Sequence, residues 1–91
     1  MIVRRLIITG QVQRVFYRDW TIATATSLGL AGWVRNRRDG SVEALLVGEE
    51  GAVARMIDAC REGPELAEVD AVQVEDAEPE PLTAFERRRT E

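Results

Sequence analysis

The segment from Gly10 to Arg18, GQVQRVFYR, leads from a predicted strand into a predicted helix and suggests the binding of an anion. A loop that enters a helix presents unpaired backbone N–H groups, and the helix dipole adds positive potential. Arg18 stands at the end of this loop, where a guanidinium can donate two parallel hydrogen bonds to phosphoryl oxygens. An ordinary strand-to-helix loop with a surface arginine is the alternative interpretation.

Asn36 is the second residue whose position suggests chemistry, because it falls near the end of a predicted strand, just before the turn at Arg38-Asp39-Gly40. Asparagine is disfavoured inside strands and often only marks the turn that follows. The functional alternative is a neutral amide that holds a water molecule. These residues by themselves leave both interpretations open.

The residue types that the chain lacks exclude several mechanisms. It contains no histidine, which excludes zinc sites built on histidine and every histidine-based acid, base or phosphoryl carrier. All 12 basic residues are arginine, so a lysine nucleophile, a Schiff base and a P-loop lysine are excluded as well. Cys60 could be proposed as a phosphatase nucleophile, but Leu66 stands where such a phosphate loop needs an arginine. We therefore assign Cys60 to the core.

The composition is that of one globular domain, with 45% apolar and 31% charged residues, and we expect residues 1–91 to form a single domain. The net charge is −4, yet residues 10–38 contain five arginines and one aspartate, a formal charge of +4. This distribution favours a small anionic ligand over a nucleic-acid surface, and a scatter of solvated arginines is the alternative. Without a long apolar run or a signal-peptide pattern, and with a lone cysteine, we expect a cytoplasmic protein.

Apolar periodicity and turn residues predict the order of elements. Strands are predicted at residues 1–9, 31–37, 41–48 and 69–75, and a helix at residues 19–30. The spacing of Val53, Met56, Ile57 and Cys60 predicts one face of a second helix, which Gly63-Pro64 ends. Residues 76–81 are predicted to form a loop, after which a short edge strand carries Phe85, Arg87 and Arg89 in alternation.

We therefore expect an α+β, ferredoxin-like βαββαβ sandwich, in which two helices cover one face of an antiparallel sheet that ends in a short fifth strand. This fold serves enzymes, RNA-binding domains and regulatory domains alike, so it does not decide the function. We assign Arg35, Arg37 and Arg38 mostly to a solvated hairpin.

The sequence resembles the acylphosphatase family in two segments that occur in the family's order. The second family signature, G-F/Y/W-A/V/C-K/R/Q/A/M-N-x3-G-x-V-x5-G, is matched in full from Gly32 to Gly48. The first, G-x-V-Q-G-V-x-F/M-R, is matched at Gly10, Val12, Gln13, Val15 and Arg18. Tyr17 is a mild departure at the Phe or Met position. The predicted order of elements extends the resemblance over nearly the whole chain.

The resemblance implies a metal-free enzyme without a cofactor that hydrolyses acyl phosphates. Backbone amides of the loop would bind the phosphoryl group, Arg18 would clamp it, and Asn36 would orient the attacking water. The implied phosphate-binding residues are Gln13, Arg14, Val15, Phe16, Tyr17 and Arg18. The chemistry is consistent with this, because a carboxylate leaving group needs little protonation and a metaphosphate-like phosphoryl group needs mainly positioning and charge stabilisation. The proton of the water could pass to the substrate's own phosphate oxygens.

Arg14 is the clear departure from the family, which usually has glycine at this position. Glycine permits a positive φ without strain, whereas arginine incurs a steric penalty there. We expect the loop to tolerate Arg14, with its side chain directed mostly to solvent.

Two other functions share the predicted fold. A non-enzymatic ferredoxin-like module could bind an anion or RNA, but residues 41–47 lack the paired aromatic residues of RNA-binding sheets and the chain is acidic. An acylphosphatase-like domain specialised for carbamoyl phosphate, as in hydrogenase-maturation proteins, belongs to much longer chains. We expect a small-molecule acyl phosphate substrate, no nucleic-acid or membrane partner, and a monomer.

Overall fold

The computed structural model describes residues 1–91, in which five strands and two helices follow the predicted order. They are β1 (Ile2–Gln11), α1 (Tyr17–Ser27), β2 (Ala31–Asn36), β3 (Val42–Gly48), α2 (Glu50–Glu62), β4 (Glu68–Asp76) and β5 (Phe85–Arg87). No helix has the length and apolar character needed to cross a membrane.

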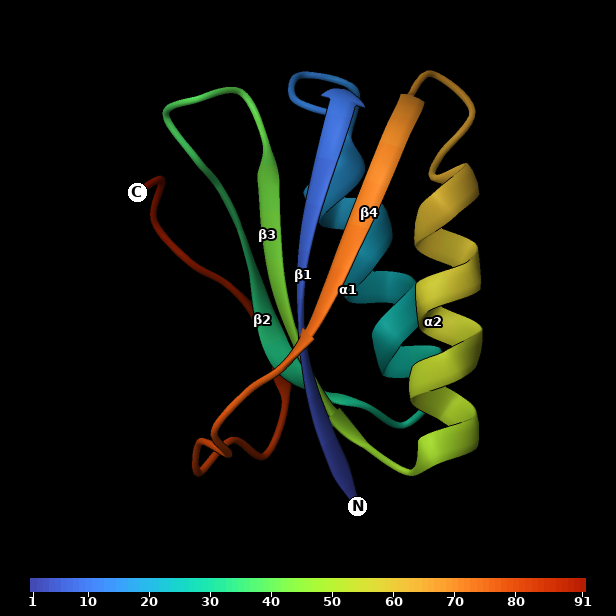
Figure 1. The fold of residues 1–91 in the computed structure, drawn as a ribbon, viewed down its shortest axis with the longest axis vertical. Coiled ribbons are helices and arrows are strands. Elements are labelled where there is room, and N and C mark those ends of the chain that lie inside the picture. Colours follow the sequence, from blue (N-terminus) through green and yellow to red (C-terminus); the bar gives the residue numbers. More distant parts are fainter.

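The strands form one sheet in the order β4-β1-β3-β2-β5, and both helices pack on the same face of it (Figure 1). β1 pairs antiparallel with β3 and β4, and β2 pairs antiparallel with β3. β5 is parallel to β2, so the five-stranded sheet is mixed. The predicted ferredoxin-like sandwich with a short C-terminal strand is confirmed.

The strand register brings together the two segments that the sequence analysis selected. Ile8, near the end of β1, pairs with Val42 at the start of β3, and Val42 pairs on its other side with Asn36 at the end of β2. The loop that follows β1 therefore starts at the same edge of the sheet as Asn36. Residues far apart in the sequence meet there because antiparallel pairing places the end of one strand beside the start of the next.

The main core lies between the helices and the sheet. Leu6 and Ile8 alternate along β1 and are fully buried, and each such side chain stabilises the fold by roughly 1.5–3 kcal/mol. Val53, Met56 and Cys60 form the buried stripe of α2, as the periodicity predicts. Burial raises the pKa of the Cys60 thiol to about 11, so the thiol stays protonated at neutral pH and belongs to the core.

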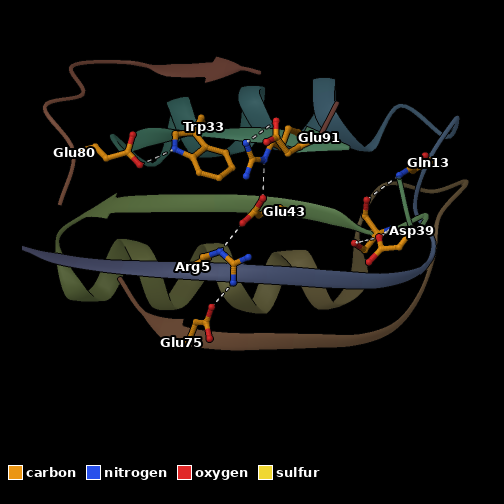
Figure 2. Close-up of polar contacts among 10 residues, drawn as sticks. Arg5, Gln13, Trp33, Asp39, Glu43, Glu75, Glu80 and Glu91 are labelled. Atoms are coloured by element: carbon orange, nitrogen blue, oxygen red, sulfur yellow. Dashed lines mark hydrogen bonds and ion pairs between the residues drawn. The ribbon is translucent and has the colours of Figure 1, made fainter. Parts of the chain in front are cut away.

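The assignment of Arg35 to a solvated surface was wrong, because its side chain is only 23% exposed. On the sheet face away from the helices, Glu43 is only 2% exposed, and it accepts hydrogen bonds from Arg5 Nε at 2.5 Å and Arg35 Nε at 2.6 Å (Figure 2). The Arg35 guanidinium also lies 4.7 Å from the centre of the Trp33 ring. A buried carboxylate needs such partners, and pairing across strands is not visible in local sequence patterns.

The bounds of α1 and β5 differ from the prediction by about two residues. Helix α1 begins at Tyr17, so Arg18 lies in its first turn, and it ends at Ser27, before Gly29 at φ 73°. Gly29 reverses the chain at low steric cost. Strand β5 ends at Arg87, which leaves the predicted position Arg89 outside it.

Gly10 and Gly32, two of the motif glycines, are required by close backbone contacts. They have φ angles of 121° and 148°, which are accessible mainly to glycine. A Cβ atom would lie 2.2 Å from the carbonyl oxygen of Glu68 at Gly10 and 1.9 Å from that of Leu45 at Gly32. Glycine at these two positions therefore allows the close approach of β1 to β4 and of β2 to β3.

Candidate active site

A cavity of about 260 Å³ opens where the loop after β1, the first turn of α1, the end of β2 and the edge strand β5 meet. Of the residues predicted to bind or act on phosphate, its lining includes Arg14, Phe16, Tyr17, Arg18 and Asn36. Gln13 and Val15 are not among the lining residues. The fold thus brings the predicted arginine and asparagine to one cavity although they come from different elements.

Arg18 projects from the first turn of α1 and is half-buried. Burial lowers its pKa, and the nearby charge of Arg87 lowers it further. Arginine nevertheless remains protonated in proteins, so the side chain is a cation that has lost part of its hydration and is repelled by a neighbour. A bound anion would relieve both penalties.

Asn36 presents an unsatisfied polar atom. It lies two residues beyond Val34, which is buried under the helices, so the alternation of β2 directs the Asn36 side chain to the same face. Its Oδ1 atom is buried and has no hydrogen-bond partner within the protein. An unpaired buried acceptor costs about 1–3 kcal/mol, which a bound donor such as water would offset.

The loop between β1 and α1 presents its backbone N–H groups. None of the backbone hydrogen bonds made outside the helices and strands is donated by residues 14–19. Residues 17–19 begin α1, where N–H groups have no partner within the helix, and the N-cap residue Phe16 makes no side-chain capping bond. The free donors and the helix dipole together make this loop suited to an anion.

Gln13 fixes the loop against the β2–β3 hairpin. Its Nε2 atom donates hydrogen bonds to the carbonyl oxygens of Arg37 at 2.7 Å and Ser41 at 2.8 Å. Figure 2 shows Gln13 reaching the hairpin that carries Asp39. These contacts hold the loop at a set position relative to Asn36, which immediately precedes Arg37.

Tyr17 anchors the start of α1 in the core. The residue is 1% exposed, its hydroxyl donates a 2.7 Å hydrogen bond to the carbonyl oxygen of Cys60, and its ring meets Trp20 edge to face. Burial raises the pKa of the phenol, so Tyr17 does not exchange protons near neutral pH. Tyr17 carries a hydroxyl that the family's usual Phe or Met lacks, and this hydroxyl finds its hydrogen-bond acceptor in α2.

Arg14 adopts the conformation that glycine would adopt. Its φ is 64°, and Phe16 two residues later has a φ of 63°. Left-handed backbone costs a non-glycine residue roughly 1–2 kcal/mol. The Arg14 side chain is exposed and lies along the wall of the cavity. The loop thus tolerates arginine at the cost of local strain, which is common at functional sites.

We expect Arg14→Gly to stabilise the protein by about 1 kcal/mol, because relief of strain exceeds the entropy that glycine adds to the unfolded chain. For a domain of this size the melting temperature should rise by about 4–8 °C. Arg38→Gly is the matched control, since Arg38 is exposed and does not have a positive φ, and it should destabilise the protein. Equal shifts in the two melting temperatures would contradict the strain at Arg14.

Asp19 and Arg87 also line the cavity, and the sequence analysis did not select them. Asp19 comes from the first turn of α1 and Arg87 from β5, and their side chains form an ion pair. The alternation of Phe85 and Arg87 indicated only an edge strand. This alternation does not reveal that β5 pairs in parallel with β2 and lies next to α1.

No group of three or more histidine, cysteine, aspartate or glutamate side chains is arranged to hold a metal ion. The charged and amide side chains among the lining residues are those of Arg14, Arg18, Asp19, Asn36 and Arg87. This arrangement suits the binding of a phosphoryl anion and a water molecule.

The chain is similar in sequence and in fold to known acylphosphatases. The acylphosphatase family model matches residues 4–87. An acylphosphatase of Acidiphilium cryptum is 48% identical over 99% of both chains, and one of Rhodopseudomonas palustris is 54% identical over 89% of this chain and 82% of its own length. The crystal structure of acylphosphatase from Bacillus subtilis superposes with a TM-score of 0.93 at 34% identity, covering 97% of this chain and 99% of that one.

Proposed function

Because the chain belongs to the acylphosphatase family and hydrolyses acyl phosphates, we propose that its first loop and Arg18 hold the phosphoryl group while Asn36 orients the attacking water. The observation that supports this division most directly is the unpaired, buried Oδ1 of Asn36 in the cavity that Arg18 also lines. Arg18 offers a positive charge to the anion, and Asn36 offers a hydrogen-bond acceptor to the water.

The reaction that these groups support is an in-line displacement at phosphorus. The water oxygen forms a bond to phosphorus, the bond between phosphorus and the acyl oxygen breaks, and the carboxylate leaves with the bonding electron pair. The carboxylate is stable as an anion, so no general acid is needed. The water proton passes to a phosphoryl oxygen of the substrate, which yields inorganic phosphate.

The loop and Arg18 act mainly through charge and position. Negative charge is spread over three equatorial oxygens in the transition state, and the backbone N–H groups of residues 14–19 with the Arg18 guanidinium are available to stabilise it. Partial burial of Arg18 strengthens this attraction relative to a fully hydrated cation. The Gln13 contacts to the hairpin keep the phosphate loop and the water-binding amide in register.

Phosphate release from benzoyl phosphate in the presence of EDTA tests this function. We expect hydrolysis to survive chelation, because the proposed site uses only arginine, asparagine and backbone groups. The matched measurement repeats the assay after adding a divalent ion, which should leave the rate unchanged. Loss of activity in EDTA with recovery on adding the ion would contradict the metal-free mechanism.

We further propose that the protein acts as a cytoplasmic monomer on small molecules and does not bind nucleic acid. Its net charge of −4 supports the absence of nucleic-acid binding. Its large exposed apolar residues are few and spread along the chain, which supports a monomer. These residues are Met1, Phe16, Leu66 and Val74. Light scattering on a sizing column should give a mass near 10.2 kDa.

A further inference from the structure

Arg87 lies at the edge of the candidate site, on the helix-facing side of β5. Phe85, its neighbour in the strand alternation, is buried in the core beneath the helices, so Arg87 is directed to the same side. Arg87 pairs in register with Val34, two residues before Asn36. Its side chain is 45% exposed and lines the cavity together with Arg18 and Asn36.

The charges that line the cavity are unbalanced. Three arginines and one aspartate give a formal charge of +2. The charge of Arg87 reaches Arg18, since it contributes to the lowered Arg18 pKa. Asp19 is the only carboxylate in the lining, and its Oδ1 atom is paired with Arg87 rather than with Arg18. The carboxylate therefore occupies the guanidinium that an incoming anion could otherwise bind.

We propose that Arg87 is a second arginine ligand of the phosphoryl group and that Asp19 restrains it by competing with the substrate for its guanidinium. The inference rests on the proposed function and adds a residue to that site. On binding, the guanidinium would exchange the Asp19 carboxylate for phosphoryl oxygens. Both partners are largely solvent-accessible, at 45% and 61%, so the exchange requires only side-chain rotation. An exposed ion pair is weak enough to be replaced by a doubly charged anion.

Substitutions of the two partners separate this role from a structural one. Asp19→Asn and Arg87→Gln both break the ion pair. If the pair only ties β5 to α1, both substitutions should change the inhibition constant of inorganic phosphate in the same direction. If Arg87 binds the phosphoryl group, the changes have opposite signs. We expect Arg87→Gln to raise the inhibition constant of inorganic phosphate about tenfold, and Asp19→Asn to lower it about threefold.

The double variant distinguishes competition from simple repulsion. Removing the Asp19 charge would favour any anion in the cavity, even if Arg87 never touched it. We therefore expect the effect of Asp19→Asn to disappear in the Arg87→Gln background, because the residue that it restrains is gone. A full threefold effect in that background would show that Asp19 acts directly on the anion and would overturn the restraint.

Arg88, the residue that follows β5, provides the matched control. Its guanidinium lies 4.9 Å from the centre of the Trp33 ring and 3.1 Å from Glu80, away from the cavity. Arg88→Gln should leave phosphate inhibition unchanged, and melting temperatures monitor folding of all variants. If Arg87→Gln matches Arg88→Gln in a protein that hydrolyses benzoyl phosphate, the role of Arg87 is wrong and the proposed function stands. If the wild-type protein neither hydrolyses benzoyl phosphate nor binds phosphate, the proposed function itself fails.

Discussion

Asn36→Ala is expected to lower kcat for benzoyl phosphate by about a hundredfold or more, while the inhibition constant of inorganic phosphate changes little. Loss of one oriented partner of the transition state costs on the order of 3 kcal/mol, which is about a hundredfold in rate. Asn36 is assigned to the water and not to the anion, so ground-state binding of phosphate should survive. Steady-state kinetics with phosphate as a competitive inhibitor measure both quantities in one experiment.

The stability of this variant gives an independent check. The Asn36 Oδ1 atom is buried without a partner, so alanine removes an unsatisfied acceptor rather than a hydrogen bond. We expect the melting temperature to stay level or rise slightly while activity falls. A loss of activity accompanied by marked destabilisation would assign Asn36 to the fold, and weakened phosphate inhibition would assign it to the anion.

Arg18→Ala is expected to lower kcat/KM by about a thousandfold and to weaken phosphate inhibition at the same time. Arginines that stabilise transferring phosphoryl groups contribute factors of about a thousand or more to the rate. Arg18 would touch the phosphoryl oxygens in both the ground and transition states, so both KM and kcat should suffer. The same benzoyl phosphate and phosphate-inhibition assays apply.

Arg38→Ala is the control for Arg18→Ala, because Arg38 is an exposed arginine on the hairpin and does not line the cavity. The control should keep wild-type kinetics if the effect depends on position rather than on total charge. Arg18→Ala with unchanged phosphate inhibition would contradict the clamp, whatever happened to the rate.

The sequence predicted those features that depend on local patterns. The α2 stripe from Val53 to Cys60 and the Asp-Gly hairpin were correct because helix periodicity and turn chemistry act over a few residues. The two signatures also placed Arg18 and Asn36 in segments that the fold brings to one cavity. Their catalytic roles remain predictions.

The features that the sequence could not predict involve distant partners or backbone angles. The ion pair of Arg87 with Asp19 joins elements far apart in the sequence. The ion pair of Arg35 with Glu43 depends on the exact register of the β2–β3 hairpin. Neither pair leaves a periodic signal. The positive φ of Arg14 could not be predicted from the sequence either, because φ is set by the contacts of the whole loop. Both kinds of information come from tertiary packing rather than from residue types.

The candidate site concentrates features that reduce stability. The loop holds two non-glycine residues, Arg14 and Phe16, at positive φ, and Asn36 carries an unpaired acceptor. Functional sites tolerate such costs because unusual backbone angles and unpaired polar groups are often what a ligand needs for binding. The expected gain in stability from Arg14→Gly follows from the same balance.

Hydrolysis of benzoyl phosphate in heavy-oxygen water tests attack at phosphorus most directly. If the water near Asn36 attacks the phosphoryl group held by Arg18 and the loop, mass spectrometry should find the heavy oxygen in inorganic phosphate and ordinary oxygen in benzoate. A reaction without protein under the same conditions corrects for spontaneous hydrolysis. Heavy oxygen in the benzoate would place the attack at the carbonyl carbon and contradict the proposed roles of all three groups.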